Sequence, residues 1–156
     1  MQAIFRPAVE TDIPMLAKAR LDFLQILGHT TPDEDFFCAQ KQIEGFLHAQ
    51  LNRQIFAWLA FVDQNPSSVG FLQIFNVMFH PTSHTGRYGR IINVLTWPEY
   101  RNQGLARIVM EHLIAQARDL GLDYVNLHAS PEGRHLYETL GFVEDHPIDP
   151  SMTLYF

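Results

Sequence analysis

The sequence has little positive charge. Among its 156 residues, 11 Lys and Arg stand against 17 Asp and Glu, which gives a formal net charge of −6. The basic residues form no stripe along the chain, so we expect no nucleic-acid partner held through phosphate contacts. The acidic balance instead favours cationic amines over polyanions as partners.

Cysteine and long apolar runs are also scarce. Cys38 is the single cysteine, so no disulfide within the chain is expected. The start Met1-Gln2-Ala3 has neither the basic nor the apolar region of a secretory signal peptide. No apolar run approaches the roughly 20 residues that cross a bilayer. These absences predict a cytoplasmic protein with no membrane partner.

Hydrophobic periodicity predicts one domain of alternating helices and strands. With 47% apolar residues, the chain is long enough for one core and short for two. We expect strands at residues 4–8, 55–62, 69–78, 88–96, 124–129 and 152–156, and a hairpin connection at 63–68. Helices are expected at residues 11–28, 33–52, 104–120 and 131–140. This order predicts an α/β fold, with a mixed sheet that carries helices on both faces.

Residue spacing within the helices predicts what they bury. Thr11 is the expected N-cap of the first helix, with Pro14 in its first turn and Gly121 as the stop of the third. Cys38 is expected to be a buried thiol. The apolar residues expected in the core are Leu16, Ala19, Leu21, Phe23, Leu24, Leu27, Phe36, Phe37, Ile43, Phe46, Leu47, Leu105, Ile108, Val109, Leu113 and Ala117.

The turn R-N-Q-G-L-A at residues 101–106 follows a predicted strand and opens a predicted helix. Gly104 permits close backbone approach, and the free amides of a helix start point toward any anion placed there. The first acid inside the helix is Glu111, whereas Arg101 and Arg107 flank its start. A bound anion would supply the missing negative charge. The pattern predicts a pyrophosphate site, although an ordinary strand-turn-helix junction would also explain the turn alone.

Two further segments place this turn in a wider pattern. Before it lies N-V-L-T-W-P-E-Y at residues 93–100, and after the helix lies L-Y-E-T-L-G-F at residues 136–142. Together the three segments resemble the signature of the GNAT acyl-CoA N-acyltransferases. The segment I-F-R-P-A at residues 4–8 is similar to the first strand of that family. The resemblance implies the GNAT fold, a mixed and mostly antiparallel sheet whose central strands splay apart around an acyl-CoA thioester.

The resemblance also implies which residues bind acetyl-CoA. The backbone of Val94, Leu95 and Thr96 would meet the pantetheine arm by strand addition, and residues 102–107 would cradle the pyrophosphate. Ser130 stands where many relatives have Asn and Gly133 where they have Ala, so Ser130 offers one hydrogen bond or instead caps the following short helix. The cofactor-binding residues implied are Val94, Leu95, Thr96, Arg101, Asn102, Gln103, Gly104, Leu105, Ala106, Arg107 and Ser130.

Tyr137 occupies the position of a family tyrosine that lies near the cofactor sulfur. The resemblance implies a general acid there, which protonates the leaving thiolate; a packed helical tyrosine is the alternative. No motif identifies the base that deprotonates the amine. The residues considered for that role are His128, His29, Glu34 and Asp35.

Other side chains are expected to be inert. Glu99 is expected to be a solvated turn residue, and the scattered histidines, including His80 and His84, predict no metal site.

The activity predicted from these features is acetyl transfer from acetyl-CoA to a primary amine, by direct attack in a ternary complex. Small amines and peptide amino groups both remain open as acceptors. A non-catalytic acyl-CoA-binding or regulatory domain is the alternative. A nucleotide-binding domain of another kind finds no support, because neither G-x-x-x-x-G-K-[ST] nor G-x-G-x-x-G occurs. A homodimer and a monomer both fit the composition.

Overall fold

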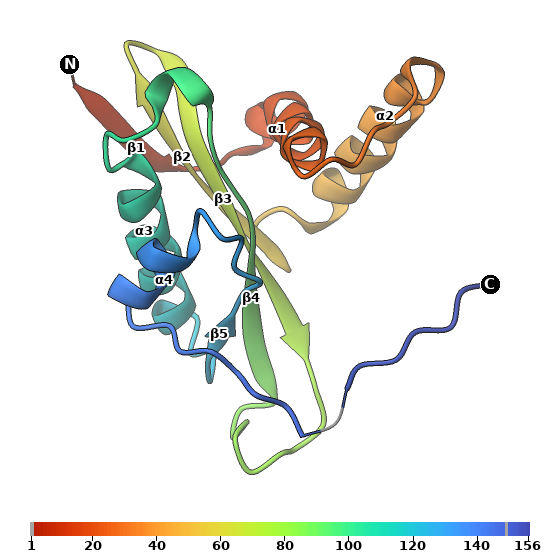
Figure 1. Ribbon diagram of the computed structural model, residues 1–156, viewed down its shortest axis with the longest axis vertical. Coiled ribbons are helices and arrows are strands. Elements are labelled where there is room, and N and C mark those ends of the chain that lie inside the picture. The colour runs from red at the N-terminus through yellow and green to blue at the C-terminus, as the bar shows by residue number, and fades with distance from the viewer. Residues whose placement is uncertain (1, 149) are drawn as a thin grey trace.

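Five strands form one sheet in the order β1-β2-β3-β4-β5 (Figure 1). The computed structural model describes residues 2–148 and 150–156. Neighbours from β1 to β4 pair antiparallel, and β5 joins β4 in parallel, so the sheet is mixed and the predicted α/β class is confirmed. The strands are β1 Ala3–Pro7, β2 Ile55–Val62, β3 Asn65–Asn76, β4 Arg87–Thr96 and β5 Val125–Asn126.

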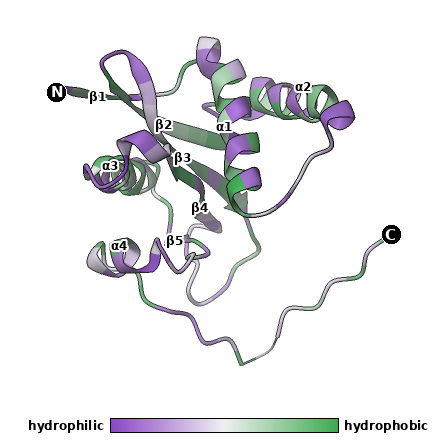
Figure 2. Cartoon of the chain, turned by 45° about the horizontal axis from the view of Figure 1, so that its top comes forward, coloured by the Kyte–Doolittle hydropathy of each residue, from purple (hydrophilic) through white to green (hydrophobic). Residues whose placement is uncertain are grey.

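Helices cover both faces of the sheet, as Figures 1 and 2 show. One core cluster lies between the sheet and the helices α1 and α2, and a second lies between the sheet and α3. The first is called the α1-side cluster and the second the α3-side cluster, and the side of the sheet that carries the first is called the α1 face. The helices are η1 Glu10–Asp12, α1 Ile13–Ile26, α2 Asp33–Gln50, η2 Pro98–Tyr100, α3 Leu105–Asp119 and α4 Arg134–Thr139.

Helical spacing predicted the buried side of α3 well and that of α1 in part. Of the residues predicted in the first helix, three are fully buried, whereas Leu27 at its end is 49% exposed. In α3 four of the five predicted residues are buried, and Ile108 is half-buried. Gly121 ends this helix with φ of 68°, as predicted.

The predicted core of α2 is largely wrong. Leu47 is buried and Ile43 packs against the α1-side cluster, but Phe36, Phe37 and Phe46 are 40%, 69% and 44% exposed. Cys38, predicted to be buried, is exposed as well. The reason is that α2 packs against α1 and extends away from the sheet, so its outer side meets no second layer. Helical spacing alone does not say on how many sides a helix is covered.

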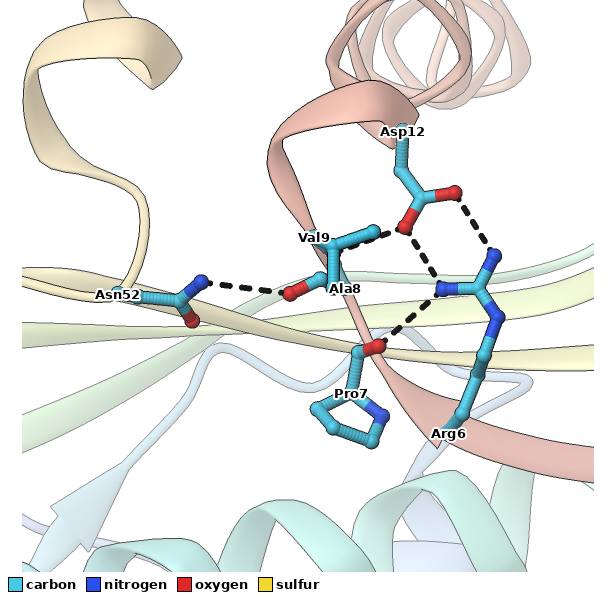
Figure 3. Close-up of polar contacts among 6 residues, drawn as sticks. All are labelled: Arg6, Pro7, Ala8, Val9, Asp12 and Asn52. Atoms are coloured by element: carbon cyan, nitrogen blue, oxygen red, sulfur yellow. Dashed lines mark hydrogen bonds and ion pairs between the residues drawn. The ribbon is translucent and has the colours of Figure 1, made fainter.

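The first helix begins differently from the prediction. Thr11 is not its N-cap, because a short η1 turn precedes α1 and Asp12 occupies the capping position. The Asp12 carboxylate accepts hydrogen bonds from the Val9 amide at 2.8 Å and from the Arg6 Nη1 and Nη2 atoms at 2.7 and 2.8 Å (Figure 3). Arg6 thus ties the end of β1 to the start of α1.

The connection between β2 and β3 is shorter than predicted. Asp63 and Gln64 have φ of 48° and 67°, and the strand already resumes at Asn65 rather than after Ser68. Two central residues with positive φ are typical of a type I′ hairpin turn, which matches the twist of the flanking strands. The sequence lacks the Asn-Gly or Asp-Gly pair that usually predicts this turn.

Two predicted elements at the end of the chain are corrected. The strand expected at residues 124–129 is reduced to Val125–Asn126, and the helix expected from residue 131 begins at Arg134. Residues 152–156, predicted as a closing strand, have no regular secondary structure. They lie away from the sheet (Figure 1), and Met152 there is 91% exposed. An apolar run predicts a strand only where a partner edge is within reach, which periodicity does not reveal.

Candidate functional site

A bulge in β4 shapes the centre of the sheet. The pairing of β3 with β4 shifts register between Val69 and Phe71, so β4 has one extra residue there. Asn93 lies at this point with φ of 55° and is 2% exposed. Asn tolerates the left-handed region better than most residues, which explains its place in the bulge. The extra residue shifts the alternation of side chains along β4 by one position. After the bulge, Leu95 therefore packs in the α1-side cluster and Val94 packs against the α3-side cluster.

Asn93 also connects the bulge to α1. Its Nδ2 donates to the Ala19 carbonyl at 3.5 Å, and its Oδ1 accepts from Arg20 Nη1 at 3.5 Å. Both hydrogen bonds are long, so they fix the direction of the side chains more than they stabilise the fold. Neither residue was predicted from the sequence as part of the site. Asn in a β-rich run was the only signal for Asn93, and Arg20 gave none.

In the described part of the chain, β5 pairs with only two residues of β4. The two strands pair only at Gly89 with Val125 and at Arg90 with Asn126. From Ile91 to Thr96, the β5-side edge of β4 has no strand beside it among the described residues. The predicted splaying of the central strands is therefore present. An open strand edge of this kind can pair with an extended ligand that carries amide groups.

The turn after β4 exposes a row of backbone amides. Asn102 and Gly104 have φ of 60° and 76°, and η2 precedes them. No acceptor within residues 2–148 or 150–156 receives a hydrogen bond from the amides of residues 102–107, whereas the Ile108 amide bonds to the Gly104 carbonyl at 3.4 Å. Residues that alternate between left-handed and right-handed backbone form a concave anion site known as a nest. This turn has that geometry at the start of a helix.

The charges around the turn favour an anion. The first turn of α3 has no acidic residue. This turn is the N-terminal end of the helix, where the helix dipole is positive. Arg101 is exposed and its Nε donates to the Thr96 carbonyl at 3.2 Å, which folds it back over the end of β4. Arg107 donates through Nη2 to Thr139 Oγ1 at 2.6 Å and lies 3.4 Å from Glu111 Oε1. Arg107 therefore links α3 to α4 next to the turn.

Ser130 has a local partner. Its Oγ accepts a hydrogen bond from the Gly133 amide at 3.2 Å, and its carbonyl accepts from the Arg134 amide at 3.0 Å. The helix α4 begins only after Gly133, so Ser130 stabilises the turn that leads into the helix rather than capping it directly. A hydroxyl that already accepts one bond can still donate one.

Tyr137 lies on α4, next to the α3-side core cluster. It packs against this cluster together with Val94, and its ring meets Phe142 edge-on at 6.1 Å between centroids. Burial raises the pKa of the Tyr137 phenol above its ordinary value of 10.0, so the hydroxyl keeps its proton at neutral pH. No hydrogen bond to this hydroxyl occurs within the described part of the chain. The group is thus a neutral acid without a protein partner.

The four candidate bases lie in different parts of the structure. His29 lines a pocket of about 170 Å³ between α1 and α2, together with Asp33 and Thr31. Glu34 and Asp35 are exposed on the first turn of α2 and do not line this pocket, and His128 is exposed in the segment after β5. Glu99 is exposed on η2, as predicted. No single base emerges from this geometry.

Across residues 2–148 and 150–156, no three His, Cys, Asp or Glu side chains come together closely enough to hold a metal ion. In that part of the chain, none of the helices combines the length and the apolar character that a membrane span requires.

The arrangement fits a diphosphate that continues into an amide-bearing arm. The free amides of residues 102–107 suit the diphosphate, and the open edge of β4 from Ile91 to Thr96 begins immediately before them along the chain. Tyr137 packs against the same cluster as Val94. The structure thus joins the predicted strand, turn and tyrosine in one region.

Comparison with known sequences finds a matching family and similar proteins. Residues 17–142 match the family described as Acetyltransferase (GNAT) family. An uncharacterized N-acetyltransferase, ycf52, of Porphyra purpurea is 31% identical over 90 residues, which are 56% of this chain and 48% of that protein. The homologous protein of Gracilaria tenuistipitata var. liui is 33% identical over 64 residues, 41% of this chain and 35% of that protein. The aligned part thus spans about half the length of these relatives, or less.

Solved structures share the fold over nearly the whole chain. A predicted acetyltransferase of Clostridium acetobutylicum, crystallised with acetyl-CoA, has a TM-score of 0.85 at 24% identity and covers 97% of this chain and 96% of its own. A GCN5-related N-acetyltransferase of Ralstonia eutropha JMP134 has a TM-score of 0.82 at 20% identity, with coverages of 97% and 99%. The glucosamine-6-phosphate N-acetyltransferase of Arabidopsis thaliana has a TM-score of 0.71 at 18% identity, with coverages of 100% and 99%.

Proposed function

This chain belongs to the acetyltransferase (GNAT) family, and on that premise we propose that it transfers an acetyl group from acetyl-CoA to a primary amine. The amine attacks the thioester directly while both substrates are bound. The observation that carries the proposal is the row of unbonded amides at residues 102–107, at the start of a helix whose first turn has no acid. These groups suit the diphosphate of coenzyme A.

The residues proposed to hold acetyl-CoA are mostly backbone donors and acceptors. Val94, Leu95 and Thr96 lie on the open edge of β4 and would bind the amides of the pantetheine arm. The amides of residues 102–107 would bind the diphosphate, with Arg101 and Arg107 adding positive charge beside it. Ser130 would donate its free hydroxyl proton near the same arm. Acetyl-CoA supplies the acyl group as an activated thioester.

Tyr137 is proposed as the general acid. Its phenol keeps its proton because burial raises its pKa, and no protein acceptor among the described residues competes for that proton. A proton held at this oxygen is available to the thiolate that departs from the acyl carbon. A positioned acid of this kind contributes roughly a hundredfold or more to a rate.

The acceptor amine must lose a proton to attack, because an amine with a pKa near about 10.4 is mostly charged at neutral pH. We propose that solvent water removes it, because the structure singles out none of His29, Glu34, Asp35 and His128 as the base.

The activity is tested by measuring release of free thiol from acetyl-CoA in the presence of a panel of primary amines. Thiol release that depends on both the amine and the protein, with the acetylated amine identified by mass spectrometry, is the expected result. A protein that binds acetyl-CoA tightly yet releases no thiol with any amine would favour a second function. That function is a non-catalytic acyl-CoA-binding domain.

The second function has one observation in its favour. Ser130 stands where many relatives have Asn, and its hydroxyl already accepts a bond from the Gly133 amide. The retained Tyr137, neutral and half-buried, argues for turnover instead. Thiol release separates the two functions because both predict binding of acetyl-CoA and only one predicts its consumption.

A further inference from the structure

Two arginines lie on the α1 face of the sheet without a carboxylate partner. Arg20 projects from α1 toward the bulge of β4, where its Nη1 lies 3.5 Å from Asn93 Oδ1. Arg90 lies on β4 before the bulge, on the same side as Ile92 of the α1-side cluster, because residues two apart along a strand share a face. Arg90 is three residues before Asn93, roughly 10 Å along the strand.

Neither guanidinium is neutralised by the protein. Among the described residues, no Asp or Glu oxygen lies within 4 Å of Arg20 or Arg90, and the only side-chain partner of Arg90 Nε is Asn126 Oδ1 at 3.0 Å. The acid nearest in sequence to Arg20 on α1, Asp22, is already engaged by Lys18 Nζ at 2.7 Å and by Trp97 Nε1 at 3.1 Å.

Arg20 is half-buried, so the lack of a carboxylate partner for its charge is costly. Burial is the cause that lowers the pKa of its guanidinium, and no neighbouring acid offsets that effect. An arginine cannot lose its proton to relieve the cost, because its ordinary pKa lies far above neutral pH. Buried charges in proteins are normally paired or bind a ligand.

Part of the face on which these arginines lie has no helix packed over it. In Figure 1, β3 and β4 continue past α1 and α2, so no helix covers the lower half of this face. Stacked rings line it: Phe75 meets Tyr88 at 5.2 Å and Tyr88 meets Tyr124 at 5.1 Å between centroids. Arg90 Cζ lies 5.5 Å from the centroid of Phe75, which orients its guanidinium over the face.

We infer that Arg20 and Arg90 form a subsite for an anionic group of the acceptor, so that the amine acetylated by this protein carries a carboxylate or a phosphate. This inference rests on the proposed function and names its substrate class. Arginine binds both anions through paired N–H donors, so the chemistry is shared between the two. Asn93 precedes Val94, Leu95 and Thr96, so the anion would be held next to the strand edge proposed for the thioester arm.

The local charge thus differs from the charge of the whole chain. A net charge of −6 favours cationic amines approaching the protein from a distance. At the site itself the unpaired charges are positive, and direct contacts within a partly buried site are screened less than surface charges. The subsite therefore decides specificity, whereas net charge affects only the encounter.

The test compares matched amines with the wild-type protein. Alanine against alaninamide tests the carboxylate, and glucosamine 6-phosphate against glucosamine tests the phosphate. We expect at least one amine that carries the carboxylate or phosphate to exceed its counterpart without that group about tenfold or more in kcat/KM, and to bind more tightly by calorimetry in the presence of coenzyme A. Counterparts without the anionic group that are equal to or better than both amines that carry it would overturn the inference, even if acetyl transfer itself is found.

Variants then locate the subsite. Arg20→Gln and Arg90→Gln should each remove most of the preference for the anionic amine while the neutral partner and the Kd of acetyl-CoA stay unchanged. Arg20→Lys should keep part of the preference that Arg20→Gln loses. Arg118→Gln, an exposed arginine at the end of α3, is the matched control and should change nothing.

The outcomes keep the two proposals apart. Loss of acetyl-CoA binding in the wild type contradicts the proposed function itself. Acetyl transfer that is retained, with an anion preference that survives both Gln variants, contradicts only the subsite. If Arg20→Gln lowers the melting temperature strongly, Arg90→Gln and the wild-type comparison still decide the question.

Discussion

The ring of Tyr137 lies directly against Gly133, one turn earlier in the chain. A Cβ added to Gly133 would lie 2.8 Å from Tyr137 Cε2 and 3.1 Å from its hydroxyl oxygen. No side chain fits in that space unless the ring moves. The absence of a side chain at residue 133 therefore sets the position of the hydroxyl proposed as the general acid.

Gly133→Ala should displace that hydroxyl. The backbone of Gly133, with φ of −85°, accepts alanine without strain, so the effect acts through the ring. We expect kcat to fall about tenfold, because a small misplacement of an acid affects the proton transfer, while the Kd of acetyl-CoA stays within about twofold. Steady-state kinetics and calorimetry check both values. Gly45→Ala, at a helical glycine with nothing within 4 Å of the new Cβ, is the control and should leave kcat unchanged.

Tyr137→Phe should lower kcat about a hundredfold and leave acetyl-CoA binding unchanged. Since burial raises the pKa of this phenol above 10.0, the acid form persists through neutral and mildly alkaline pH. The wild-type kcat should therefore show no loss from tyrosine ionisation through neutral and mildly alkaline pH. An unchanged kcat in the variant would exclude the general-acid role while leaving the cofactor site intact.

Asp12→Asn should destabilise the fold by about 1–3 kcal/mol, because the nearly buried carboxylate accepts charge-assisted bonds from Arg6. The Arg6 hydrogen bond lowers the pKa of Asp12. The stabilisation is thus fully present above the ordinary pKa of the carboxyl and disappears as pH falls through the lower, folded-state value. Urea melts at several pH values measure this.

The difference between wild type and Asp12→Asn should be constant near neutrality and shrink below pH of about 4. Glu10→Gln is the control, because Glu10 pairs with His48 at 3.5 Å and its side chain is 82% exposed. Exposed pairs contribute about 0–1 kcal/mol. A difference for Asp12→Asn that is as large at pH 2 as at neutral pH would contradict the role of its charge.

Local patterns in the sequence predicted the parts of the fold that local forces decide. Alternation of apolar residues identified β4, and helical spacing identified α3 with Val109 and Leu113 in the core. The acid-free start of α3 after Gly104 followed from residue types alone. These features depend on backbone sterics and on burial of one face, which neighbouring residues reveal.

Features that depend on distant partners were not predictable. The bulge at Asn93 arises from the register with β3, and the shortness of β5 depends on how far it can pair with β4. The exposure of Phe37 and Cys38 depends on whether another layer covers α2. The unpaired Arg20 becomes visible only when α1 is placed on β4. Such properties belong to tertiary packing, for which one sequence contains no direct signal.

Calorimetric titration of coenzyme A into the protein and into two glycine variants tests the central claim most directly. Gly104 and Gly121 begin and end α3 with φ of 76° and 68°, and a Cβ at either meets nothing within 4 Å. Gly104→Leu and Gly121→Leu should therefore lose similar stability. The account predicts that coenzyme A binds the wild type and Gly121→Leu alike, and binds Gly104→Leu at least about tenfold more weakly, because a side chain at residue 104 crowds the diphosphate. Equal affinity for all three proteins, or no binding to the wild type, would contradict it.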